Sequence, residues 1–144
     1  MTSNSHSAWL GGCAVALSAL LFLGSSATLA ADTKVTLTGD AEVPAVQTSA
    51  TGTGTITVGE DKSISGSVTT KGVTAVAAHI HHAPMGKNGP PIITLEQTSD
   101  GVWSVPKGSK LTDAQYASYK AGELYVNVHS AQHKAGEIRG QLKP

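Results

Sequence analysis

Three of the six histidines in this 144-residue chain lie within four positions: His79, His81 and His82. The sequence of residues 74–82 is typical of a β-strand. Successive side chains of a strand point to opposite faces. His79 and His81 therefore share one face, while Ile80 lies on the other. Two imidazoles arranged in this way can reach a single metal ion.

A second strand, residues 124–129, ends in a further histidine, His129. Its apolar residues share one face, and Asn127 and His129 share the other. If the apolar faces of both strands point into one core, His79, His81 and His129 form a three-histidine surface site. Imidazole suits copper and zinc, and the Irving–Williams order favours copper. The alternative is a purely structural role, in which the imidazoles cap loops or bond backbone carbonyls.

Several further residues are candidates for auxiliary roles at this site: His82, His133, Glu42, Asn127 and Arg139. Glu42 could accept an imidazole N–H, and Asn127 could orient a ligand. Arg139 could steer an anion, because its guanidinium suits planar anion recognition. The simpler expectation for Arg139 is an exposed cross-strand pair with Glu137, which would contribute under about 1 kcal/mol.

Short alternating segments separated by turns make up most of the chain after residue 33. They predict strands over residues 34–39, 52–58, 63–69, 74–82, 92–95, 102–105, 124–129 and 137–142. Thr112 and Gln115 form a capping box, and Gly122 provides a stop, so residues 112–122 should be a short helix. We predict an all-β fold, either an antiparallel β-sandwich or a partly closed barrel, with one short helix. Its predicted core contains Ile56, Val58, Ile64, Val68, Ile80, Val126, Val128, Ile138 and Leu142.

The first thirty residues differ from the rest in composition. Residues 10–23 form an apolar run that is too short for a membrane span, and small residues follow it. We predict a signal peptide over 1–30, cleaved near Ala30 or Ala31, and one domain over 31–144. The single cysteine, Cys13, belongs to the signal peptide, so the mature domain can have neither a disulfide nor a thiolate ligand. A secreted or periplasmic location follows, without membrane insertion after processing.

Charge and aromatic content narrow the range of partners. The ten basic residues balance the ten acidic residues, and the chain has no basic block. Phe, Trp and Tyr together amount to 4% of residues, which offers no stacking platform for bases. We therefore expect no nucleic-acid partner.

Sequence motifs along the whole mature chain resemble the CHRD domain, the module named after chordin. They are Leu37-Thr38-Gly39 with Glu42-Val43-Pro44, Ala78-His79-Ile80-His81, residues 86–90, Leu111-Thr112, residues 122–129 and residues 136–142. The resemblance implies an immunoglobulin-like β-sandwich of the kind found singly in bacterial secreted proteins. It implies no particular activity.

A looser resemblance connects the histidines to copper,zinc superoxide dismutases, which also carry a His-x-His strand, a later strand-end histidine and a C-terminal arginine. His79, His81, His129 and Arg139 follow that order, but residues 83–128 contain no histidine, so the bridging ligand and the zinc loop have no counterpart. We predict a secreted module that binds a metal ion, copper first and zinc second. The alternatives are a dismutase-type copper oxidoreductase and an extracellular protein-interaction domain. No nucleophile arrangement or acid–base carboxylate pair stands out, so we rank the module above the enzyme.

Overall fold

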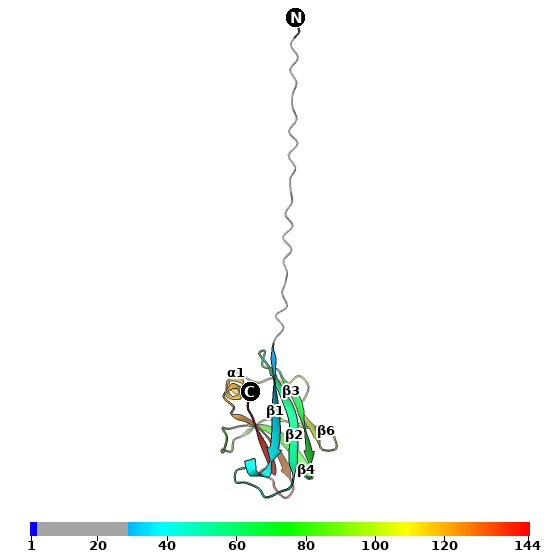
Figure 1. Cartoon of the computed structure of the whole chain (residues 1–144), viewed down its shortest axis with the longest axis vertical. Helices are drawn as coiled ribbons and strands as arrows, with labels where there is room; N and C mark the ends of the chain where they lie inside the picture. Colours follow the sequence, from blue (N-terminus) through cyan, green and yellow to red (C-terminus); the bar gives the residue numbers. More distant parts are fainter. Residues whose placement is uncertain (3–28) are drawn as a thin grey trace.

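A computed structural model describes residues 1–2 and 29–144 of the chain. Cys13 and most of the predicted signal peptide lie outside these residues. The elements are β1 (Ala30–Thr38), η1 (Gly39–Ala41), β2 (Thr51–Gly59), β3 (Ile64–Lys71), β4 (Ala75–His82), β5 (Pro91–Thr94), β6 (Glu96–Ser99), β7 (Val102–Ser104), α1 (Asp113–Lys120), β8 (Leu124–Ser130) and β9 (Ile138–Leu142). Figure 1 shows β1, β2 and β3 side by side.

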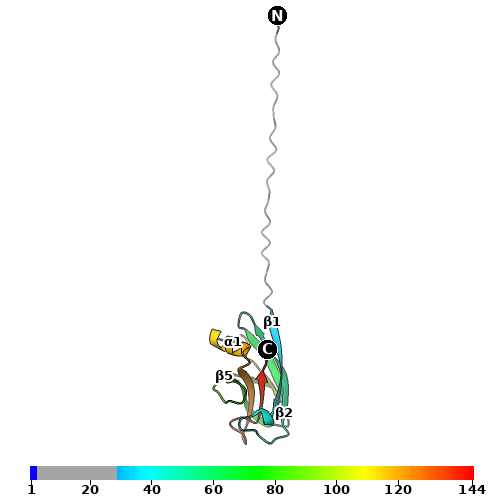
Figure 2. The ribbon, with the colours of Figure 1, turned by 60° about the vertical axis from the view of Figure 1, so that its left-hand side comes forward.

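All nine strands belong to one sheet, in the order β5-β4-β8-β9-β1-β2-β3-β7-β6, and every pairing is antiparallel. β1 and β9 are paired in register at Thr38 and Arg139, and there the sheet folds over. In Figure 2, β5 lies on one side of the domain, with β1 and β2 on the other. The prediction of an antiparallel all-β fold with one short helix is confirmed.

The core lies between the two halves of the folded sheet. Every residue of the predicted core belongs to one buried cluster, which also includes Leu37, Trp103 and Leu124. On β2 and β3 alternate residues face inward, which explains why Ile56, Ile64 and Val68 are buried. β8 differs, because all seven of its residues are buried. Loops must therefore cover the face of β8 that points away from the core.

The helix is capped as its sequence predicted. The Gln115 N–H donates to Thr112 Oγ1 at 3.2 Å, and the Thr112 N–H donates to Gln115 Oε1 at 2.9 Å. Gly122 ends the segment with a φ of 73°. β6 was missed, because its four residues are all polar and exposed and show no alternation.

Candidate metal centre

The histidines lie on the face of β4 and β8 that points away from the core. Ala78 pairs with Val128 and Ile80 with Val126 on the core side. Because side chains alternate along each strand, His79, His81 and His129 all project from the opposite face. The predicted placement of the three rings on one face is confirmed.

The three rings meet at one point, and we refer to His79, His81 and His129 as the triad. Each supplies a nitrogen that lies within 4.8 Å of the other two. His79 Nδ1 is 3.0 Å from His129 Nε2, and the centroids of the His79 and His81 rings are 5.6 Å apart. Nitrogen ligands about 2.1 Å from a tetrahedral ion are about 3.4 Å apart. A small closure of the triad would therefore suffice to hold an ion.

Backbone carbonyls fix the tautomers of two of the rings. His81 Nδ1 donates to Gly89 O at 2.9 Å, and His129 Nδ1 donates to Lys134 O at 3.0 Å. In a neutral imidazole the other nitrogen, Nε2, then carries the lone pair. Both Nε2 atoms therefore carry the lone pair that a metal ligand needs, and a carbonyl behind each ring is the usual support of a metal-bound histidine.

The Nε2 atom of His81 supports this reading most strongly. It is buried and has no hydrogen-bond partner within the described part of the chain. Buried polar atoms nearly always have a partner, so one without a partner requires an explanation. His129 Nε2, by contrast, accepts from His79 Nδ1. A metal ion at the triad would satisfy the lone pair of His81.

The triad is less exposed than a surface site would be. His81 and His129 are each 8% exposed, and only His79 is half-buried. Burial lowers the pKa of all three imidazoles below their ordinary value of 6.5. The rings are therefore neutral at pH 7, the form that binds a metal. The predicted location of the site at the protein surface is wrong for His81 and His129, because loops cover this face of the sheet.

One of these loops, residues 83–90, is held by Arg139 and is called the covering loop below. The guanidinium donates to Lys87 O at 2.8 Å and to Asn88 Oδ1 at 3.3 Å. Arg139 is 1% exposed, and its Cζ lies 3.5 Å from the centroid of the Tyr125 ring, which stacks on His81 with centroids 5.0 Å apart. Arg139 thus supports both the loop that supplies Gly89 O and the ring against which His81 rests.

The expected exposed pair between Glu137 and Arg139 is wrong. Glu137 is 8% exposed and accepts from Thr48 Oγ1 at 2.8 Å, whereas Arg139 is bonded to the covering loop and to Gln141. Glu137 directly precedes β9 and Arg139 lies within it, and both side chains are buried. Arg139 is also not free to steer an anion, because its NH1 and NH2 groups already have acceptors.

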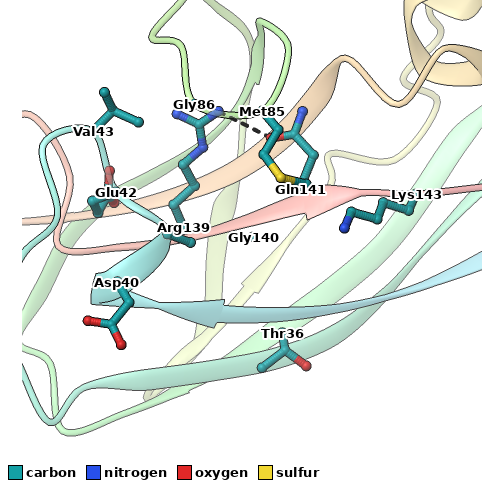
Figure 3. Close-up of a pocket in the computed structure, with 11 residues that line it drawn as sticks. Thr36, Asp40, Glu42, Val43, Met85, Gly86, Arg139, Gly140, Gln141 and Lys143 are labelled. Carbon is teal, nitrogen blue, oxygen red and sulfur yellow. Dashed lines mark hydrogen bonds between the residues drawn. The ribbon is translucent and has the colours of Figure 1, made fainter.

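Glu42 and Asn127 contact each other, not the imidazoles. Asn127 Nδ2 donates to Glu42 Oε2 at 3.5 Å, and Glu42 lines a hollow shared with Arg139 and Met85 (Figure 3). Burial raises the pKa of Glu42 to about 7, against the opposing effects of Arg139 and the hydrogen bond from Asn127. The predicted role of Glu42 as imidazole acceptor belongs instead to the carbonyls of Gly89 and Lys134.

His82 and His133 do not join the triad. His82 Nε2 lies 3.0 Å from Ser118 Oγ and 3.7 Å from Glu123 Oε2, on the side of the strand that faces α1. His133 lies in the turn after β8, where its N–H donates to Ser130 Oγ at 3.1 Å. Neither residue belongs to the group of side chains that could hold a metal.

Three contributors to the site were not among the predicted site residues. Gly89 O and Lys134 O are main-chain atoms, so their residue types carry no information about their role. Gly89 itself is required, because a Cβ there would collide with His82 O. Tyr125 is the third contributor, and strand alternation places it on the same face as Asn127 and His129.

Comparison with known protein families matches residues 33–142 to the CHRD domain. The match covers most of the chain, so this protein belongs to the CHRD domain family. No curated protein and no solved structure gives a significant match. The looser resemblance to copper,zinc superoxide dismutases stays a prediction. None of the described helices has the length and apolar character needed to cross a membrane.

Proposed function

We propose that this CHRD-domain protein is an extracytoplasmic module that binds one metal ion, preferentially copper, through His79, His81 and His129. The observation that carries the proposal is the buried Nε2 of His81, which has no partner among the described residues and belongs to a ring that supplies one of three imidazole nitrogens within 4.8 Å of one another. Structural histidines would be expected to satisfy both ring nitrogens, as His129 does.

Copper is favoured by the chemistry of the donors. The triad offers three nitrogens, and neither a thiolate nor a carboxylate belongs to this group of side chains in the described part of the chain. Calcium and magnesium need oxygen ligands, so they are poor candidates. Among divalent ions that accept imidazole, copper binds more tightly than zinc at a given site.

The decisive experiment is a titration of the tag-free mature protein with Cu(II) and, separately, with Zn(II). Stoichiometric copper binding should weaken at least about tenfold in each of His79→Ala, His81→Ala and His129→Ala, because loss of a ligand costs more than loss of its support. His82→Ala and His133→Ala are matched controls, since each removes an imidazole outside the triad. Equal losses in controls and triad variants would move the metal elsewhere.

The pH dependence of binding provides a second check. Protons compete with the metal for the ring nitrogens. Because burial lowers the pKa of the triad histidines, copper affinity should stay constant from pH 8 down to the ordinary histidine value of 6.5 and decline only below it. A decline that begins above pH 7 would indicate that exposed histidines bind the metal.

A further inference from the structure

A metal ion at the triad would keep its full charge. All three candidate ligands are neutral imidazoles, and the group contains no carboxylate among the described residues. Buried dications normally have anionic partners, because isolated charge in a low-dielectric setting is costly. A Cu(II) ion held here would therefore attract an external anion.

The triad is covered on the side of His81 and borders a hollow on the side of His79 and His129. The ring of Tyr125 stacks on His81 with a 17° angle between the planes, and the covering loop contacts the far edge of His81 through Gly89. On the other side, His79 and His129 border a hollow of about 460 Å³. Three ligands leave at least one coordination position vacant on a four-coordinate ion, and a hollow lined by two of the three ligands offers a route to that position.

The walls of this side hollow are mostly apolar. Val76, Ala77 and Ala131 line it, with Ser130 and Lys134 also contributing. Val76 is 59% exposed, so one wall is an aliphatic side chain that faces solvent. Lys134 is exposed, and it is the only ionisable residue besides the two histidines among those that line the hollow.

We propose that the side hollow admits a small monovalent anion, which binds the open position of the triad-bound metal ion. This inference rests on the proposed metal site. The dication supplies the main attraction, and Lys134 adds positive charge at the rim. The apolar walls select for weakly hydrated anions, because strongly hydrated ones lose more on leaving water. Azide and thiocyanate should therefore bind better than fluoride.

The test uses the tag-free mature protein loaded with one equivalent of Cu(II) and titrated with azide. Binding should produce a saturable ligand-to-copper charge-transfer absorption and a changed copper EPR spectrum. Thiocyanate should compete with azide, and fluoride should compete far less. Val76→Trp and Ala131→Trp place an indole at exposed positions of the hollow wall, and they should lose the azide response while still binding copper.

Lys134→Gln keeps the backbone carbonyl that bonds His129, and it should weaken azide binding by up to about fivefold, as expected for one exposed charge. Lys107→Gln, an exposed lysine that does not line the hollow, is its matched control and should leave azide affinity unchanged. Bound copper with no azide response would overturn the anion site alone. An azide response that persists in both tryptophan variants would also overturn it. Failure to bind copper at all would overturn the metal site and the anion site together.

Discussion

Glu42→Gln should change how the stability of the apoprotein depends on pH. Glu42 is 6% exposed, and its pKa rises from the ordinary value of 4.5 to about 7, chiefly because burial disfavours the charged carboxylate. Arg139 and Asn127 oppose this rise without cancelling it. One carboxyl oxygen, Oε1, also has no hydrogen-bond partner within the described residues, so the structure does little to stabilise the ionised form.

The sign and size of the effect follow from the two pKa values. A folded-state pKa above the unfolded one means that the folded protein binds the proton more tightly, so this contribution to stability is complete below pH 4.5 and is lost as pH rises through about 7. Each unit between the two pKa values is worth about 1.4 kcal/mol, so the loss amounts to about 3 kcal/mol. Glutamine stays neutral and should not show it.

Urea unfolding of the metal-free protein from pH 4 to pH 8 measures the difference. The triad histidines titrate in the same range in both proteins, so the free energy of unfolding of wild type minus that of Glu42→Gln isolates the carboxyl group. This difference should fall by about 3 kcal/mol between pH 4.5 and 7 and then level off. Glu60→Gln, at an exposed turn position, controls for the loss of one charge. A difference that is flat across this range, or that rises with pH, would refute the reasoning.

Three further predictions follow from burial and contacts. Val128→Asp should unfold the domain or destabilise it by more than about 4 kcal/mol, because it buries an unpaired charge, whereas Val76→Asp, at an exposed position of β4, should be near neutral in the same thermal melts. Arg139→Lys should cost about 2 kcal/mol in urea unfolding and weaken copper binding about tenfold, since it loosens the covering loop behind His81; unchanged copper affinity would separate the loop from the site. Intact mass of exported protein should place the mature N-terminus at or close to Ala31, and a full-length mass from washed membranes would contradict cleavage.

Strand alternation was enough to predict the core and the common face of the triad. Ile80, Val126 and Val128 all lie in the core cluster, and the intervening histidines project to the other side, because a strand has only two faces. The pairing of β4 with β8 was not predicted, and it is what brings the histidines of the two strands together. The capping box of α1 could also be predicted, because it depends only on residues three apart in the sequence.

The alternation of apolar and polar residues did not predict that the face of β8 and β9 pointing away from the core is also buried. A polar residue opposite a core residue is ordinarily assigned to solvent, and that is why Glu137 and Arg139 were expected to be exposed. The burial of Arg139 depends on the path of the covering loop, which its bond to Lys87 O helps to fix, and Glu137 is bonded to Thr48, which is distant in the sequence. β6 was missed for a related reason, because the backbone pairing of this edge strand with β7 needs no apolar side chains.

The covering loop and residues 131–137 are both hydrogen-bonded to the histidine face of the sheet. Each contributes a backbone carbonyl to one imidazole, Gly89 O to His81 and Lys134 O to His129. The contacts that fix these segments to the sheet therefore also orient the rings, so loop order and metal affinity are thermodynamically linked. A metal that binds only the folded state stabilises it by RT ln(1 + [M]/Kd), about 2.7 kcal/mol at a hundredfold excess over Kd. Metal binding should consequently protect the amides of both segments from hydrogen exchange, although only the imidazoles touch the ion.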